Sequence, residues 1–342
     1  MFLVIFGFLT SCVVLLFSKN IVLFLGGTGE LYSYTKEYLN TIILFSIFFM
    51  SGYAMEVYIR LDGNPTFPMI SVITGGIMNV IMDYILIVVF PFGIKGAAFA
   101  TGLSQITTSS ILLIYILTRS KNLKFVKINN FFKKIGRIIY IGFSEFLAEV
   151  STGISIFLFN MNILHILGDN GVSAFSIISY ITTFVTMAMI GFNQGLQPIV
   201  SYNLGKKNFE NIRKVFKIAL ATVILFGLFF YGIVNIFTEN IVKSFVNDQN
   251  TIDLTVKSIK IYSIAYIVSG INIVCAGYFT SIKKVKQATF ITALRGIILI
   301  FIFISILPKF WGETGLWLTV PTAELVTLII SVYFISKLKK EQ

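Results

Sequence analysis

The sequence predicts an all-α integral membrane protein made of two parallel-repeat helical lobes, and three observations support this. Hydrophobic residues make up 56% of the 342 residues and charged residues only 12%, whereas soluble domains are about 45–50% apolar and about 25% charged. Apolar stretches of about 20 residues, the length that crosses a ~30 Å hydrocarbon core, recur along the chain. The third observation is an internal repeat at an offset of 220 positions.

The apolar stretches predict ten spanning helices. They are continuously apolar, whereas the strands of a membrane barrel alternate apolar and polar residues, so a helical bundle is favoured. The expected spans are 1–18, 37–59, 67–90, 96–118, 138–164, 172–197, 215–237, 258–280, 286–308 and 315–336.

The repeat first shows in FSKNIV at 17–22 and FTENIV at 237–242. The offset spans an even number of helices, so the two copies have the same orientation in the membrane. Parallel repeats of this kind are typical of secondary transporters whose substrate site lies between two halves. The register continues through Tyr58 with Tyr278 and Gly76 with Gly296 and, after a one-residue gap, Gly93 with Gly312 and Gly96 with Gly315.

The repeat also predicts the domain organisation. A basic stretch at 119–137 is expected to be a cytoplasmic linker between a first lobe at 1–118, with four helices, and a second lobe at 138–342, with six. Carried back by 220 positions, the start of the second lobe corresponds to a point well before Met1. The sequence is therefore expected to be truncated, without the first two helices of its first lobe.

Basic residues predict the orientation, because loops rich in Lys and Arg stay cytoplasmic. With alternating helix ends, 19 basic residues fall in loops and a tail on one side and 7 on the other. The C-terminus is therefore expected in the cytoplasm. The net charge of +12 is explained by anionic lipid headgroups rather than by nucleic acid, and no nucleic-acid partner is expected.

Few residues offer enzymatic or metal chemistry. The two cysteines, Cys12 and Cys275, lie within apolar helices, and His165 is the only histidine, so neither a disulfide framework nor a Cys/His metal site is expected. Since no nucleophile elbow or phosphate-binding loop is present either, an integral membrane enzyme is disfavoured, and no cofactor is expected.

Two stretches resemble the multidrug and toxic compound extrusion (MATE) transporters of bacteria. They are RLDGNPTFPMISVITGGIMNVIMDYILIVVFPFGIKGAAFATGLSQ at 60–105 and GFNQGLQPIVSYNLGKKN at 191–208. The resemblance covers the whole chain and implies the 6+6 helix architecture of that family, here reduced to 4+6.

A candidate site for the coupling cation lies in the first lobe. Asp83 is near the middle of an apolar helix, where a carboxylate is costly unless it is paired, hydrated or protonated. Asn79 is one turn earlier on the same face, so the two can share a proton or cation, or simply form an interhelical hydrogen bond. The resemblance to MATE transporters implies that Tyr38 and Thr101 complete this site, together with an aspartate on a first helix that has no counterpart here.

The second lobe holds three further candidates for cation or substrate binding, which are Glu149, Glu324 and Arg295. Arg295 is expected either to pair with Glu324 within the membrane or to snorkel to the interface.

A gate or hinge is predicted at the second motif. Proline removes a backbone donor, so Gln197-Pro198 is expected to end a helix, with a turn at Tyr202, Asn203 and Gly205.

The combined prediction is a monomeric antiporter of the bacterial inner membrane. It would export amphiphilic or cationic drugs or toxic metabolites, surrounded by membrane lipids, in exchange for H⁺ or Na⁺ as the coupling ion and by alternating access. Two alternatives stay open, which are a lipid-linked oligosaccharide flippase of the same superfamily and a truncated fragment that does not transport.

Overall fold

The computed structural model describes residues 2–24, 29–120, 123–124 and 131–341, which form helices and no strand. The chain divides into two compact units, unit 1 at Met1–Ile128 and unit 2 at Asn129–Gln342. The boundary falls inside the stretch predicted as a linker, 119–137, whose last residues already belong to a helix that begins at Phe131.

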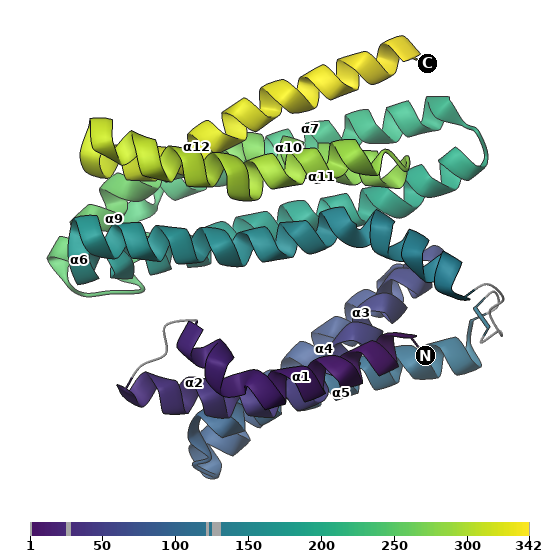
Figure 1. Ribbon diagram of the computed structural model, residues 1–342, viewed down its shortest axis with the longest axis horizontal. Coiled ribbons are helices and arrows are strands. Elements are labelled where there is room, and N and C mark those ends of the chain that lie inside the picture. The colour runs from purple at the N-terminus through teal and green to yellow at the C-terminus, as the bar shows by residue number, and fades with distance from the viewer. Residues whose placement is uncertain (1, 25–28, 121–122, 125–130, 342) are drawn as a thin grey trace. The chain divides into compact units, whose positions relative to one another are not determined.

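Unit 1 is a bundle arranged around one central helix. That helix is α5, which packs against α2, α3 and α4 (Figure 1). Small residues on α5 make this close packing possible, and its buried positions include Gly96, Ala98, Ala100 and Gly102. The elements are α1 (Phe2–Phe24), α2 (Gly29–Ile42), η1 (Ile43–Phe45), α3 (Ser46–Leu61), α4 (Thr66–Asp83), η2 (Tyr84–Val89) and α5 (Gly93–Thr118).

Unit 2 is also built around one helix, α10, which contacts α6, α7, α11 and α12. Its largest fully buried side chains include Trp317 and Tyr266. The elements are α6 (Phe131–Gly205), α7 (Phe209–Ile236), α8 (Thr238–Lys243), α9 (Gln249–Tyr262), α10 (Ala265–Ser281), α11 (Val285–Ala293), η3 (Leu294–Ile298) and α12 (Leu299–Glu341).

The membrane-length helices agree with the predicted spans. Among the described residues, seven helices are long and apolar enough to cross a bilayer, and α9 with α10 forms an eighth span bent by 47°. Two of the seven, of 72 and 54 residues, are too long for one crossing and are interrupted at Gly168 and Gly312. Counting the second segment of each interrupted helix brings eight spans to the ten that the sequence predicts.

The two interruptions are hairpins that only glycine accommodates easily. Gly168 has φ 65° and ψ −158°, and Gly312 has φ 53° and ψ −131°. Side chains with a Cβ rarely adopt this backbone region. Gly93, which the repeat aligns with Gly312, has φ 57°, so both units turn at the same repeat position.

The helix that contains Gln197 and Pro198 does not end there, and this part of the gate prediction is wrong. α6 continues to Gly205, so Tyr202, Asn203 and Gly205 form its last turn rather than a loop. Proline forfeits a single backbone hydrogen bond, and within a bilayer a continuous helix satisfies the other backbone groups. The turn itself lies at Lys206–Asn208, where the Asn208 N–H donates to the Asn203 carbonyl (2.9 Å).

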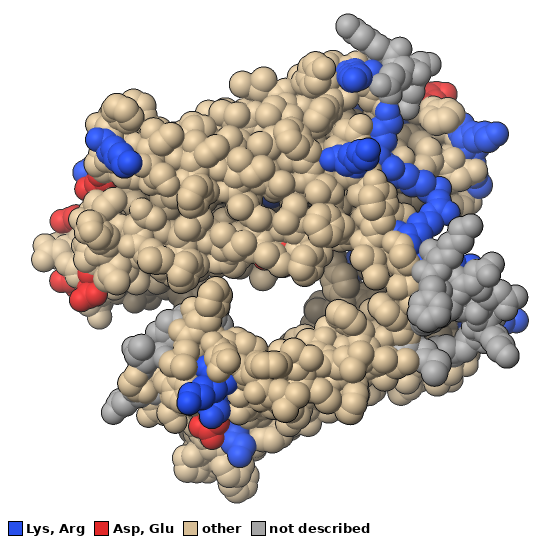
Figure 2. Space-filling view, viewed as in Figure 1, with Lys and Arg blue, Asp and Glu red and all other residues tan. Residues whose placement is uncertain are grey.

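Charged and apolar residues are segregated on the surface of unit 2. On the face drawn in Figure 2, acidic side chains lie near one end of its helices, most basic ones gather at the other end, and an uncharged band separates them. The exposed face of α7 is made of bulky apolar residues such as Leu225, Phe229 and Ile236. Such a face is stable where hydrocarbon rather than water surrounds it.

One pair of equivalent turns differs in its residue type. Gly63 after α3 has φ 93°, and Lys283 after α10, which the repeat aligns with Gly63, has φ 65°. Both turns are closed by a hydrogen bond from the next residue back to the helix, Asn64 N to Ile59 O (3.2 Å) and Lys284 N to Phe279 O (2.9 Å). Unit 2 therefore places a lysine where unit 1 uses a glycine.

Replacing Lys283 by glycine is expected to stabilise the protein by about 0.5–1 kcal/mol. A residue with a Cβ in the left-handed region costs about 1–2 kcal/mol, of which glycine's greater freedom in the unfolded chain offsets a part. The measurement is the thermal unfolding midpoint of the purified protein in detergent. Lys284→Gly is the matched control, because Lys284 has a φ of −88°; a gain in that variant equal to the gain of Lys283→Gly would contradict the explanation.

Candidate functional site

The polar cluster of unit 1 lies between α4 and α5. The Asn79 amide on α4 donates to the Thr101 hydroxyl on α5 (Nδ2 to Oγ1, 3.5 Å). The Thr101 hydroxyl in turn donates to the Ala97 carbonyl (3.0 Å). The two helices can approach closely because Gly75 has no Cβ. A Cβ at this position would collide with the Thr108 side chain and lie 3.1 Å from the Ser104 carbonyl oxygen.

Asp83 is the last residue of α4, immediately before the π-helical turn η2. Short π-helical segments inside membrane helices widen the backbone and occur frequently at functional sites. The Asp83 side chain is half-buried, and it makes no hydrogen bond or ion pair with any residue that the structure describes. Among the described residues, no side chain therefore occupies its carboxylate, which lies one turn from Asn79.

The structure does not bring Tyr38 into this cluster. Tyr38 is on α2, its side chain is 39% exposed, and within the described ranges it has no hydrogen bond to Asn79, Asp83 or Thr101. The carboxylate, amide and hydroxyl of the candidate site thus come from α4 and α5 alone. The role of this site in cation binding stays a prediction.

In unit 2 the structure decides between the two alternatives for Arg295, which pairs with Glu324 and does not snorkel. The guanidinium on η3 donates to the carboxylate on α12 from Nη2 (2.5 Å to Oε1) and from Nε (3.1 Å to Oε1). Two residues that the sequence analysis missed complete the network, Asn272 on α10 and Ser331 on α12. No pattern in the sequence could have found them, because α10 meets α12 only in the folded unit.

Glu149 has a different environment from Glu324. Its side chain is exposed on the first segment of α6, and no hydrogen bond or ion pair joins it to the described residues. It is therefore separate from the Arg295 pair, and its role in cation or substrate binding stays a prediction.

The residues predicted as a gate form contacts near the end of α6. Gln197 donates from Nε2 to the Glu145 carboxylate (2.9 Å), which links the second segment of α6 to the first. The Lys206 ammonium lies 4.4 Å from the centre of the Tyr202 ring. The Asn203 amide donates to the Ile199 carbonyl (2.9 Å). These contacts fix the end of α6, and a gating role stays a prediction.

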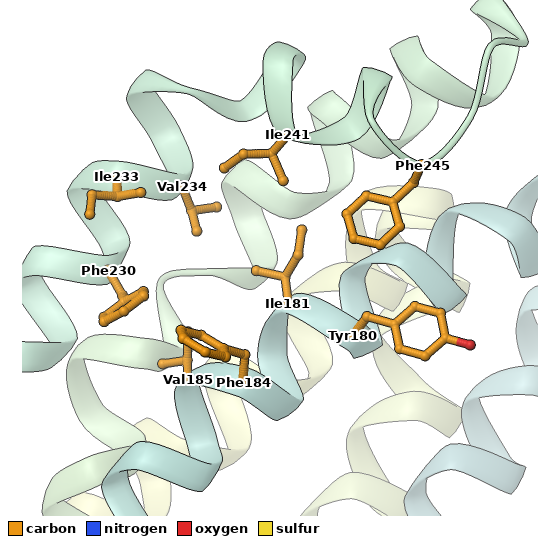
Figure 3. A pocket seen from close by; sticks show the side chains of 9 residues that line it. All are labelled: Tyr180, Ile181, Phe184, Val185, Phe230, Ile233, Val234, Ile241 and Phe245. Carbon is orange, nitrogen blue, oxygen red and sulfur yellow. The ribbon is translucent and has the colours of Figure 1, made fainter. Parts of the chain in front are cut away.

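Unit 2 also carries an open apolar groove of roughly 330 Å³ between α6, α7 and the segment around α8 (Figure 3), with Tyr180 and Phe184 exposed at its edge. Aromatic pairs border it, with ring centroids 6.3 Å apart for Tyr180 and Phe245 and 5.7 Å apart for Phe184 and Phe230. The lining residues are Tyr180, Ile181, Phe184, Val185, Phe230, Ile233, Val234, Ile241 and Phe245.

Metal-binding geometry is not found in the part of the chain that the structure describes. No group of three or more His, Cys, Asp or Glu side chains lies close enough there to hold a metal ion.

Solved structures share this fold. An outward-facing multidrug resistance MATE family transporter of the MOP superfamily superposes with a TM-score of 0.91, at 18% sequence identity, over 99% of this chain and 78% of that chain. The inward-facing conformation of such a transporter gives a TM-score of 0.76, at 19% identity, over 99% of this chain and 80% of that one. A MOP superfamily transporter from Pyrococcus furiosus, described as having a binding pocket of reverse polarity, gives 0.89 at 18% identity, over 97% and 75% of the two chains.

Sequence relatives and a family profile agree with this fold. Multidrug export protein MepA of Staphylococcus aureus (strain bovine RF122 / ET3-1) is 24% identical over 339 residues, which cover 97% of this chain and 74% of the relative. MepA of Staphylococcus saprophyticus is 23% identical over 341 residues, 98% of this chain and 74% of the relative. The profile of the MatE family matches residues 1–85 and 145–307. With this match over both units, the chain belongs to the MatE family of transporters.

Proposed function

We propose that this chain is a secondary active exporter of lipophilic or cationic compounds, driven by H⁺ or Na⁺ through alternating access. The observation that carries the proposal is the Asp83 carboxylate, which lies in a membrane helix beside Asn79 without a partner among the described residues. A carboxylate at membrane depth is expensive to keep, and in transporters such groups mark ion and proton pathways.

Export would be coupled to the ion gradient because a proton or Na⁺ binds Asp83 in one conformation of the alternating-access cycle and leaves it in the other. A proton or Na⁺ at Asp83 stabilises one conformation, and its release favours the other, so an ion gradient shifts the population. Asn79 and Thr101 supply the neutral oxygens that Na⁺ would require in addition to the carboxylate, and their mutual hydrogen bond keeps both side chains in place.

The substrate class rests on two supports. The relatives are named multidrug export proteins, and the open apolar groove of unit 2 presents aromatic and aliphatic side chains that suit a lipophilic compound. Arg295 argues against a flippase for pyrophosphate-linked lipids, because its guanidinium already pairs with Glu324.

A position in the bacterial plasma membrane with the C-terminus in the cytoplasm fits the distribution of charge. The last turns of α6 and α10, which precede two loops, are joined by a hydrogen bond from the Ser201 hydroxyl to the Ser281 carbonyl (3.4 Å). The loops that follow these two helices carry exposed basic residues, including Lys206, Lys207 and Lys283. A basic surface of this kind favours the cytoplasmic face.

The test uses the purified chain in proteoliposomes loaded with ethidium, a lipophilic cation. A pH gradient or a Na⁺ gradient is imposed in the direction that would drive export, and release is followed by fluorescence. One of the two gradients is expected to raise the release rate by about tenfold, a factor that corresponds to ~1.4 kcal/mol, and dissipation of that gradient by an ionophore to abolish the effect. Release that neither gradient accelerates would refute the proposal.

A further inference from the structure

The buried polar network of unit 2, here called the Glu324 cluster, consists of Arg295, Glu324, Asn272 and Ser331. It joins η3, α10 and α12 in the middle of the unit. Asn272 and Ser331 are 0% exposed, and the side chains of Glu324 and Arg295 are 6% and 20% exposed. A charged pair in such a place is costly unless each hydrogen-bonding group is satisfied.

Both oxygens of the Glu324 carboxylate accept hydrogen bonds, and the Arg295 Nε–H is shared between them. Oε1 accepts from Arg295 Nη2 (2.5 Å) and Nε (3.1 Å), and Oε2 accepts from the Asn272 amide (2.7 Å) and from Arg295 Nε (3.3 Å). The Asn272 carbonyl oxygen is also engaged, because it accepts from the Ser331 hydroxyl (3.0 Å). The Arg295 guanidinium therefore lies against the carboxylate where a soluble cation would otherwise bind.

Unit 1 also holds a carboxylate, an amide and a hydroxyl without a guanidinium, although not at the equivalent positions, because the repeat aligns Glu324 with Gln105. There the carboxylate is Asp83, the amide is Asn79 and the hydroxyl is Thr101. The repeat aligns Arg295 with Gly75, where a side chain would collide with Thr108. Unit 1 therefore has no room for a tethered cation at that position, whereas unit 2 contains one.

We propose that the guanidinium of Arg295 is a tethered cation that permanently fills a monovalent-cation site formed by Glu324, Asn272 and Ser331. Unit 2 then exchanges no coupling ion, and ion exchange is confined to Asp83 in unit 1. The first statement stands on the geometry of unit 2, and the second rests on the proposed function.

The proposal predicts what removal of the tethered cation does. In Arg295→Ala the Glu324 carboxylate loses its counter-charge and leaves a space of the size of a guanidinium ion. Soluble guanidinium is expected to enter that space and bind, because it offers the same planar donors to the carboxylate. Urea has the same planar form but no charge, so it should not replace the side chain.

The experiment measures thermal unfolding of the full chain in detergent, with millimolar guanidinium chloride, urea or choline chloride, concentrations far below those that denature proteins. Arg295→Ala is expected to unfold at a clearly lower temperature than the wild type and to recover more than half of that loss with guanidinium alone. The double variant Arg295→Ala with Glu324→Gln should not respond to guanidinium. A response to urea equal to that of guanidinium, or a response retained in the double variant, would overturn the proposal.

A second variant covers the case in which Arg295→Ala does not fold. Arg295→Lys keeps a tethered positive charge, so it should be more stable than an Arg295→Met variant of similar length and insensitive to guanidinium. Equal stability of the lysine and methionine variants would show that charge is not what the site requires.

A transport measurement separates this proposal from the proposed function. In proteoliposomes, ethidium release by Arg295→Ala should rise several-fold with guanidinium and not with urea. If the unfolding experiment gives the expected result while the wild type releases no ethidium, the tethered cation stands and the exporter function fails.

Discussion

Replacing Asp83 by asparagine is expected to lower ion-driven ethidium efflux at least tenfold. Asparagine has nearly the same size as aspartate and is also polar, so the fold of α4 should be preserved. It cannot take up and release a proton, nor can it neutralise a bound Na⁺. The measurement is the initial rate of ethidium efflux from energised cells that express equal amounts of each variant.

Asp62→Asn is the matched control for this substitution. Asp62 follows α3 in the turn of the same unit, where its carboxylate accepts from the Ser120 hydroxyl (2.8 Å). The chemical change is identical, but the site lies outside the membrane-spanning segment. Efflux near the wild-type rate in Asp62→Asn with loss in Asp83→Asn would support the ion site, and equal efflux from the wild type and Asp83→Asn would refute it.

Much of the fold could be predicted because the membrane imposes a simple rule on the sequence. Each crossing needs about 20 apolar residues, so the spans were visible as continuous hydrophobic runs. The repeat was visible because backbone geometry conserves its glycines between the units. Gly93 and Gly312 both have a positive φ, 57° and 53°, and a side chain cannot easily replace either one.

The course of α6 could not be predicted, because a proline that commonly ends a helix in water is tolerated inside a membrane helix. In a soluble protein a proline commonly ends a helix, which is what the sequence analysis assumed. In a membrane the remaining backbone groups have no water to bond, so the helix continues to Gly205.

The candidate sites were predictable only in part. Asn79 and Asp83 are four residues apart, so helical periodicity alone places them on one face. Asn272 and Glu324 are 52 residues apart in the sequence, and the hydrogen bond between them depends on how α10 packs against α12. The sequence therefore indicated the charged residues of unit 2, but not that their charges are fully satisfied.

Replacing Gly315 by alanine is expected to destabilise the protein by about 3 kcal/mol, the upper end of the usual cost of overpacking. Gly315 lies just after the hairpin at Gly312, where the two segments of α12 touch. An added Cβ would collide with the Leu307 carbonyl and lie 2.9 Å from the Pro308 nitrogen. Backbone atoms cannot move aside as a flexible side chain can, so the hairpin itself must open. Thermal unfolding in detergent measures the loss.

The repeat supplies a second site for the same prediction, and α7 supplies its control. Gly96, the equivalent of Gly315 in unit 1, would place a Cβ 2.7 Å from the Leu86 carbonyl oxygen, so Gly96→Ala should also destabilise. Gly232 is a helical glycine whose added Cβ would meet no atom within 4 Å; there alanine should add about 0.5–1 kcal/mol through its helix propensity. If Gly315→Ala proves as stable as Gly232→Ala, close backbone contact is not the reason that both units keep glycine at this position.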